Sequence, residues 1–143
     1  MILIKSWQDA QKEAYPIRKA VFIEEQSVPE EMELDEFDPI ARHALAYINS
    51  ICVGTARFIV KPANGVQSGW IGRMAVLVNY RKQGVGGQLL SALLELGASE
   101  GIHQFELHAQ LSAIPFYERF GFMALGDIYD EAGIAHRDMI LKI

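Results

Sequence analysis

The sequence predicts a mixed α/β domain whose sheet has both antiparallel and parallel neighbours. Three strand-like runs separated by short turns follow one another between residues 44 and 78, as in an antiparallel meander. A helical pattern at Val85–Ala98 then connects the strand Trp70–Val78 to the next strand at Phe105, and such a crossover joins parallel strands. The glycine-rich segment Arg81–Gly87 lies just after the first of this pair, where open α/β sheets bind ligands.

Size and composition limit the possible functions. The 143 residues are expected to form one domain, 1–143, and a hydrophobic content of 50% argues against disorder. The apolar start at Met1–Ile4 is too short for a signal peptide, and no apolar stretch approaches the length of a membrane span. The single cysteine, Cys52, favours a reducing, cytoplasmic location, and the net charge of −5 disfavours nucleic-acid binding.

The N-terminal quarter reads as one strand followed by two helices. Ile2–Lys5 is apolar enough for a short strand, and Ser6–Asp9 has the composition of a capping box for a helix that reaches Ala14. Pro16 suits the start of a second helix and is unfavourable inside one, so a break is expected before it. Pro29 lies at or just beyond the end of that second helix.

The rest of the chain supplies six strands and two further helices, identified by their periodicity. The strands are Ala44–Ile48, Ile51–Val60, Trp70–Val78, the alternating Phe105–Ala109, Phe122–Leu125 and Ile134–Ile143, and the helices are Val85–Ala98 and Ala113–Phe120. Together with the N-terminal elements they predict a sheet of about seven strands with about four helices.

Acidic residues are concentrated in one segment. Eight of the 18 Asp and Glu residues lie between Glu24 and Asp38, and no Lys or Arg interrupts them. Such a run is usually a solvated loop or helix face. The alternative is a negatively charged rim that attracts a cationic substrate, such as an amine.

The segment Arg81–Gly87 has the properties of a phosphate site. The first backbone N–H groups of the following helix lack intrahelical partners, and the helix dipole favours an anion there. Two nucleotide motifs fail on spacing, because a dinucleotide fingerprint needs a third glycine where Leu89 stands. A P-loop needs Lys and Ser or Thr after its second glycine, and Gly87-Gln88 does not supply them.

Two motifs resemble those of the GNAT superfamily of acyl-CoA-dependent N-acyltransferases. Arg81-x-x-Gly84-x-Gly86 is similar to its Q/R-x-x-G-x-G/A motif, and Phe116–Phe122 is similar to its Y-x-x-x-G-F segment, through Tyr117 and Gly121-Phe122. The predicted order of elements also resembles that fold along the whole chain. Further segments resemble a small bacterial ElaA-like subgroup: Arg18–Pro29 with the acidic run, His43, Leu107–Gln110 and Gly133–His136.

The resemblance implies which residues bind the cofactor-like donor, acetyl-CoA. Backbone amides from Gln83 to Gly87 would hold the pyrophosphate, and Arg81 or Lys82 would add a charged contact. The backbone of Met74–Val76 would pair with pantetheine, which requires the parallel strands to splay apart. The full set of implied donor-binding residues is Met74, Ala75, Val76, Arg81, Lys82, Gln83, Gly84, Val85, Gly86, Gly87, Gln110 and Phe116. Gln110 stands where the family commonly has Asn.

The resemblance implies that Tyr117 protonates the departing CoA thiolate, and a phenol carries the necessary proton at neutral pH. The general base is less clear, because Ile71–Arg73 offers no carboxylate on the central strand. His108 and Glu25 are the preferred candidates, followed by Glu24 and His43, and a water path to a neutral amine would need no base.

These features predict transfer of an acetyl group from acetyl-CoA to a primary amine of a small molecule or peptide, and the acidic run favours a cationic acceptor. An acyl-CoA-binding sensor or regulatory module without transfer activity is the alternative. Tyr117 argues against the alternative, because a protein that only binds needs no proton donor. Metal, nucleic acid and membrane have no predicted role, and edge strands near the C-terminus are compatible with a homodimer.

Overall fold

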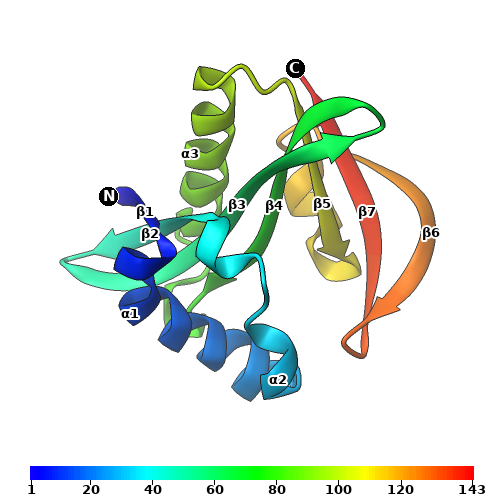
Figure 1. Ribbon diagram of the computed structural model, residues 1–143. Helices are drawn as coiled ribbons and strands as arrows, with labels where there is room; N and C mark the ends of the chain where they lie inside the picture. Colours follow the sequence, from blue (N-terminus) through cyan, green and yellow to red (C-terminus); the bar gives the residue numbers. More distant parts are fainter.

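The computed structural model describes residues 1–143 and contains one seven-stranded sheet in the order β1-β2-β3-β4-β5-β7-β6 (Figure 1). Neighbouring strands are antiparallel except β4 and β5, which are parallel as predicted. The strands are β1 (Ile2–Ser6), β2 (Arg42–Ile48), β3 (Ile51–Ala63), β4 (Val66–Val76), β5 (Gln104–Gln110), β6 (Met123–Glu131) and β7 (Ile134–Lys142). The α-helices are α1 (Trp7–Arg18), α2 (Glu30–Glu33), α3 (Val85–Ser99) and α4 (Ile114–Glu118).

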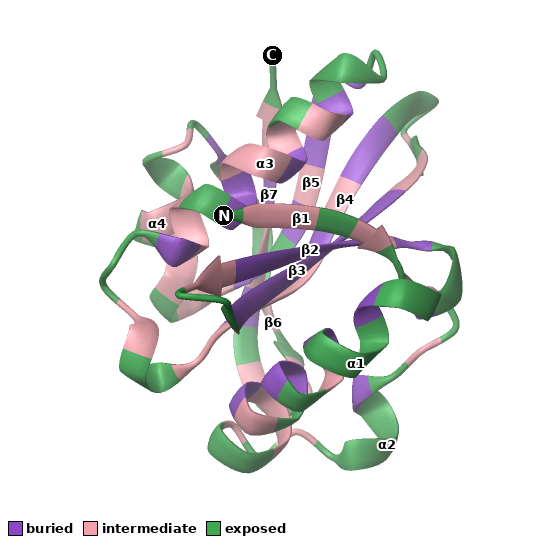
Figure 2. Cartoon of the chain, turned by 90° about the vertical axis from the view of Figure 1, so that its left-hand side faces the viewer, coloured by how far each residue is buried: buried purple, intermediate pink, exposed green.

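Alternation along β2 shows how the sheet is covered on both faces. Ala44 and Ala46 belong to the core beneath α3, whereas Leu45 between them packs with Ala10 and Ala14 of α1. Because successive strand residues point to opposite faces, α1 and α3 lie on opposite sides of the same strands. The central strands β2 and β3 are accordingly the most continuously buried part of the chain (Figure 2).

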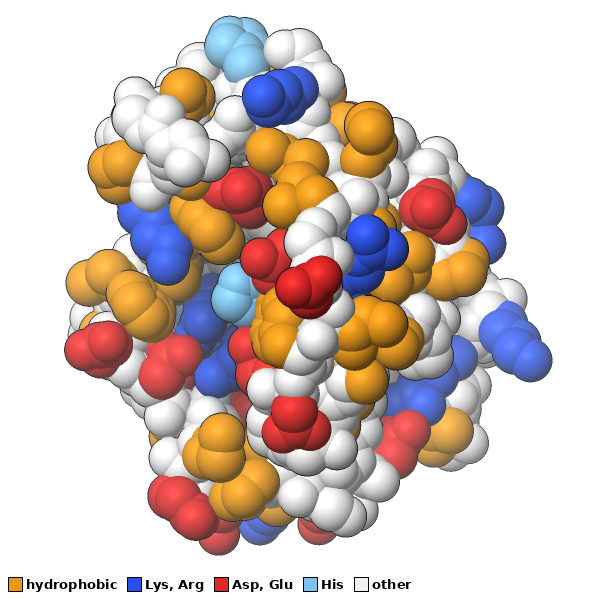
Figure 3. Space-filling view, turned by 90° about the vertical axis from the view of Figure 1, so that its right-hand side faces the viewer, with side chains coloured by type: hydrophobic (Ala, Val, Ile, Leu, Met, Phe, Trp, Pro, Cys, Tyr) orange, Lys and Arg blue, Asp and Glu red, His pale blue; other side chains and the backbone are white.

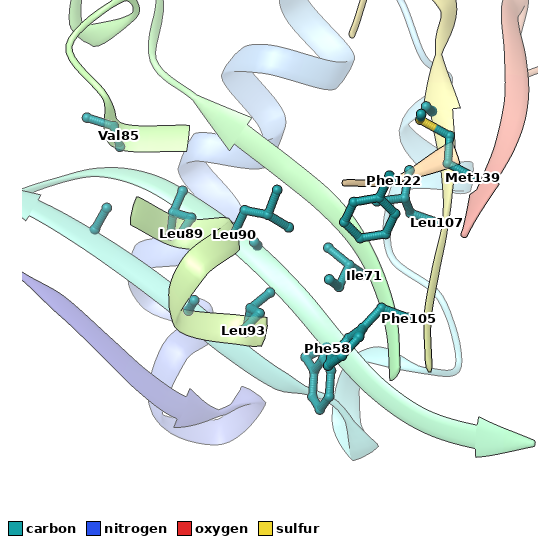
Figure 4. Packing of buried hydrophobic residues seen from close by; sticks show 14 of the residues in the cluster. Phe58, Ile71, Val85, Leu89, Leu90, Leu93, Phe105, Leu107, Phe122 and Met139 are labelled. Atoms are coloured by element: carbon teal, nitrogen blue, oxygen red, sulfur yellow. The ribbon is translucent and has the colours of Figure 1, made fainter. Parts of the chain in front are cut away.

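The main core lies between α3 and the sheet (Figure 4). Close approach of the helix and the strands depends on glycine. A Cβ atom at Gly97 on α3 would lie 2.5 Å from the Phe105 ring, and one at Gly69 on β4 would lie 2.6 Å from the Phe58 ring. Both distances are far below van der Waals contact. The two aromatic rings therefore fill the space that side chains at Gly69 and Gly97 would need.

The N-terminal helix corrects two predictions. Pro16 does not begin a new helix but lies inside α1, which continues into a π-helical segment, η1 (Lys19–Glu25). Buried side chains lie on one face of the helix both before and after the proline, at Ala10, Ala14, Ile17 and Val21. Packing of this face offsets the backbone hydrogen bond that Pro16 cannot donate. The capping box is also wrong, because Ser6 ends β1 and its side chain makes no capping hydrogen bond.

Several boundaries differ from those expected. Strand β4 begins at Val66 and ends at Val76, after which Val78 lies in a short 3₁₀ turn. Strand β6 extends from Met123 to Glu131, well beyond the predicted Leu125, because it pairs with β7 through an irregular register. Helix α4 is shorter than predicted and follows the 3₁₀ turn Leu111–Ala113.

The parallel pair β4–β5 splays apart, as the sequence required. Pairing is confined to Gly69–Ile71 opposite Phe105–Leu107. Beyond it, a bulge in β4 inserts one extra residue against β3, and Arg73 at this bulge has a left-handed φ of 49°. The backbone of Met74–Val76 therefore runs on without a partner strand on the β5 side.

Candidate active site

One cavity of about 870 Å³ runs through the opening between β4 and β5. At one end it reaches the start of α3 at Gly84–Gly87, and at the other it reaches the β6–β7 hairpin at Glu131. Met74, Ala75 and Val76 line it between these ends. The cavity thus brings most of the predicted site residues together: Met74, Ala75, Val76, Arg81, Lys82, Gly84, Val85, Gly86, Gly87, His108, Gln110, Phe116 and Tyr117.

The glycines at the start of α3 differ in what requires them. Gly84 has a φ of 82°, which side chains rarely adopt, and it precedes the first helical residue, Val85. Gly86 has no such strain, and a Cβ atom there would sit 3.5 Å from the Phe116 ring, at ordinary contact distance. The protein's own packing does not demand glycine at position 86, which fits a surface that a ligand approaches closely.

Two basic side chains follow β4 and are placed differently. The Arg81 Nε donates to the Val76 carbonyl at 2.9 Å, and its terminal nitrogens donate to both Glu25 oxygens at 2.7 and 2.6 Å. Lys82 lines the cavity and has no ion-pair partner. In this arrangement Lys82 is the cation of the loop that is free to meet a phosphate. The Gln83 side chain is directed to the Asn79 carbonyl, and Gln83 does not line the cavity.

Tyr117 projects from α4 into the apolar middle of the cavity. Its ring packs edge-on against Phe116 at 5.1 Å and Phe122 at 5.9 Å, and its hydroxyl lies 3.8 Å from the Met74 sulfur. Burial raises the pKa of Tyr117 to about 12. The phenol therefore keeps its proton throughout the neutral range, beside the strand segment predicted to hold pantetheine.

His108 lies on the face of β5 opposite the core and borders the same cavity. Its Nδ1 is 3.1 Å from Glu131 Oε1, and its Nε2 is 3.7 Å from Asp138 Oδ1. The rings of Trp70 and Tyr129 meet it edge-on at 6.1 and 5.8 Å. The hydrogen bond to Glu131 raises the pKa of His108 against the opposing effect of burial.

Glu131 was not identified from the sequence. It lies at the end of β6, and its second oxygen is 3.6 Å from Nε2 of His136, so it bridges two histidines. The turn that follows, Ala132-Gly133, has two left-handed residues and brings β7 back beside β6. Glu131 reaches His108 only because β6 pairs with β7 and β7 pairs with β5. No local sequence pattern predicts that strand pairing.

The other predicted bases do not reach the cavity. Glu25 is held by Arg81, which lowers the pKa of its carboxyl, so it makes a poor base and does not line the cavity. Glu24 is exposed outside it. His43 is buried beneath Trp7 with its Nε2 3.0 Å from the Asp38 carbonyl, and burial lowers its pKa. Of the four candidates, the structure brings only His108 to the site.

The acidic run is not a simple solvated rim, because part of it forms a buried ion cluster. Arg18 is fully buried and donates to Glu33 at 2.5 Å and to Asp38 at 2.8 Å. Asp38 also accepts from Arg57 at 3.1 Å. Burial alone would raise the pKa of this carboxyl, but the two arginines and a backbone N–H together hold it below its usual value. Three arginines and three carboxylates take part: Arg18, Arg57, Arg73, Glu33, Asp35 and Asp38.

Gln110 is positioned by a partner far away in the sequence. Its Nε2 donates to Gln26 Oε1 at 2.8 Å, linking the end of β5 to the end of η1. Glu25, the preceding residue, binds Arg81, whose Nε holds the Val76 carbonyl at the end of β4. Two consecutive residues therefore tie both arms of the splayed pair to the N-terminal helix.

The chain matches known proteins over most of its length. Residues 7–143 match the model of the acetyltransferase (GNAT) domain family. The uncharacterized N-acetyltransferase YjcF of Bacillus subtilis is 36% identical, with 90% of each chain covered. Protein ElaA of Escherichia coli is 33% identical, with 89% of this chain and 84% of ElaA covered.

Solved structures agree with these matches. The crystal structure of E. coli ElaA superposes with a TM-score of 0.83 over 99% of this chain and 100% of that chain, at 29% identity. An acyl-CoA N-acyltransferase from Pseudomonas aeruginosa superposes with a TM-score of 0.85 over 99% and 98%, at 26% identity. With the splayed strands and the glycine-rich start of α3, these matches show that the chain belongs to the GNAT acetyltransferase family and is an acyl-CoA-dependent acyltransferase.

Proposed function

We propose that the protein transfers an acetyl group from acetyl-CoA to a primary amine of a small molecule or peptide. The observation that supports it best is the single cavity that joins the phosphate-type loop, the unpaired strand edge, Tyr117 and His108. In this proposal the amine nitrogen attacks the thioester carbonyl directly, and the carbon–sulfur bond breaks. The thiolate that leaves must gain a proton, and the ammonium must lose one.

The donor end of the cavity fits a CoA ester. Backbone N–H groups at the start of α3 would receive the pyrophosphate, with Lys82 as a free cation of the same loop. The backbone of Met74–Val76, which has no partner strand on the β5 side, would pair with the pantetheine amides as an added strand. Arg81 lines the same cavity and fixes the end of β4 to Glu25 through its contacts.

Tyr117 is the proposed general acid. Its raised pKa, about 12, keeps the hydroxyl protonated, and a departing thiolate is a basic group that can take that proton. The hydroxyl's one contact is a weak one to the Met74 sulfur, so no strong hydrogen bond competes with a new acceptor.

His108 is the proposed general base, oriented by Glu131. A proton on Nδ1 is held by the Glu131 carboxylate, which leaves the imidazole ready to take a second proton at Nε2 from the acceptor ammonium or through a water. The raised pKa places this base closer to neutral pH than an ordinary carboxylate would be.

The acceptor is proposed to approach as a cation past the acidic run. Glu24, Glu30, Glu31 and Glu36 remain exposed and have no ion-pair partner, and Met32 and Glu33 of the same segment border the cavity. Long-range attraction by exposed carboxylates would raise the encounter rate with an ammonium.

No helix is long and apolar enough to cross a membrane. The one cysteine, Cys52, has no disulfide partner, which supports our assignment to the cytoplasm.

Thiol release on mixing the protein with acetyl-CoA and a panel of primary amines tests the proposal. Release above the spontaneous rate with at least one amine, accompanied by the acetylated product, is expected. Tight acetyl-CoA binding with no release across a broad panel would instead indicate an acyl-CoA-binding module.

A further inference from the structure

Another end of the cavity, beside Trp70, carries a row of side chains from β3. Arg57, Ile59 and Lys61 alternate with core residues, so they share one face of the strand, and all three line the cavity. Both cations contact the Phe37 ring: the Arg57 guanidinium carbon lies 6.0 Å and Lys61 Nζ 5.1 Å from its centroid. Two positive groups therefore converge on one aromatic side chain at this end.

Each carboxylate that lines the cavity already has a partner. Glu33 and Asp35 are paired with arginines, and Glu131 is paired with His108. Lys61 has no carboxylate within ion-pair distance, and its Nζ rests 4.5 Å from the Trp70 ring centroid. Of the other acids, Glu106 is near enough to feel the Lys61 charge, but it does not line the cavity and burial raises its pKa.

Arg57 also has N–H donors without a hydrogen-bond partner. Its Nη1 carries both contacts to carboxylates, at 2.7 Å to Asp35 and 3.1 Å to Asp38, while its Nε and Nη2 have no hydrogen-bond partner. A guanidinium has a planar set of donors suited to a carboxylate or phosphate. Acidic, basic and histidine side chains can be seen gathered on the face of the molecule shown in Figure 3.

The distance from the reaction centre constrains the ligand. Lys61 pairs with Ser68 on β4, three residues before Ile71, where the pairing with β5 ends and the splay begins. Three strand residues correspond to about 10 Å. An anion held at Lys61 would thus lie several bonds from an amine placed at the opening.

We propose that Lys61 and the free donors of Arg57 bind an anionic group of the acceptor. The acceptor is then an amine that carries, several bonds away, a carboxylate or a group of the same chemistry. This inference rests on the proposed function and deepens it, since it names the acceptor class. The exposed acids of α2 and its flanks attract the amine end, while β3 receives the anionic end.

A matched pair of probes tests the inference by calorimetric binding to the full chain saturated with CoA. The probes are 6-aminohexanoate and hexylamine, which share the amine and the alkyl chain and differ in the carboxylate. We expect 6-aminohexanoate to bind about tenfold more tightly, the effect of one charge-assisted hydrogen bond. Lys61→Gln should lower the ratio of the two affinities severalfold, with Arg57 retaining the remainder, and Lys61→Arg should restore most of it.

Lys12→Gln is the matched control, because Lys12 is exposed on α1 and outside the cavity, and it should keep the full ratio. Equal affinity of the two probes for the unmodified protein, failure of 6-aminohexanoate to bind, or a ratio that is undiminished in Lys61→Gln would each overturn the inference. Thiol release with acetyl-CoA is measured on the same amines. Turnover without carboxylate preference removes this inference alone, whereas preferential binding without turnover removes the proposed function alone.

Discussion

At the residue scale, the phosphate-type loop shows two glycines that serve different purposes. Gly84 is needed for its φ of 82°, whereas a methyl group at Gly86 would meet only ordinary contact with Phe116. The fold explains the first glycine and leaves the second to be explained by a ligand. Their alanine variants should consequently fail in different ways.

Gly86→Ala should fold normally and bind acetyl-CoA more weakly, because the added methyl group stands where the phosphate approaches the backbone. Gly84→Ala should lower the free energy of unfolding by about 1 kcal/mol or more through its left-handed backbone. Thermal unfolding and calorimetric titration with acetyl-CoA separate the two effects. Unchanged acetyl-CoA affinity in Gly86→Ala would contradict the assignment of this loop.

Tyr117→Phe removes one hydroxyl and keeps the ring between Phe116 and Phe122. Loss of a general acid lowers turnover by about 10²-fold or more, while acetyl-CoA affinity should stay nearly the same. Steady-state rates with the best amine and calorimetric binding measure the two quantities. Phe120→Leu, on the same segment but without a proton to donate, is the comparison, and equal loss in both variants would count against the acid role.

At the element scale, the β6–β7 hairpin brings the Glu131 carboxylate to His108 on β5. The groups facing the imidazole are Glu131, Asp138 and Tyr129 from the hairpin, Glu106 on its own strand and Lys61 from β3. The carboxylates favour its charged form, and Lys61 and burial oppose it. Glu131 has the largest effect on the pKa of His108, so the β6–β7 hairpin sets the pKa of the proposed base.

The raised pKa of His108 determines how the rate of the proposed reaction depends on pH. A base acts in its neutral form, so kcat/KM should rise with pH through the raised pKa of His108, above the ordinary value of about 6.5. In Glu131→Gln the pKa falls, and the acidic limb of the profile should move to lower pH. NMR titration of the imidazole in both proteins gives the same shift without relying on activity. A limb that stays in place would show that His108 is not the base or that Glu131 does not set its pKa.

How far the sequence predicted these elements depends on how local their causes are. The parallel pair and the glycine loop before α3 follow from element order and spacing, the splay follows from the family resemblance, and the structure confirms all three. Pro16 misled the prediction, because a buried stripe from Ala10 to Val21 outweighs the missing hydrogen bond. Glu131 and Lys61 reach the cavity only through strand pairing, which no local pattern of residues encodes.

At the scale of the whole molecule, the ion cluster joins parts of the chain that the sheet alone does not connect. Arg18 ends α1, Glu33 ends α2, and Asp38 begins the 3₁₀ turn before β2. Arg73 reaches from the bulge in β4 to the Glu33 carbonyl at 3.1 Å. The same cluster thus fixes the acidic segment against the bulge that opens the cavity. It also explains why a run rich in carboxylates is not simply repelled into solvent.

Arg18→Met tests this connection. Methionine keeps much of the volume but leaves Glu33 and Asp38, each about 2% exposed, without their shared cation. Removing one partner from a buried ion network costs about 3–5 kcal/mol, because the remaining charges cannot return to water. Urea unfolding should show this loss, and acceptor binding should weaken as the acidic segment loosens. Arg42→Met, which removes an exposed arginine paired with Glu100, is the control and should change stability far less. Equal losses of unfolding free energy in the two variants would mean that the buried cluster stabilises the protein no more than an exposed ion pair does.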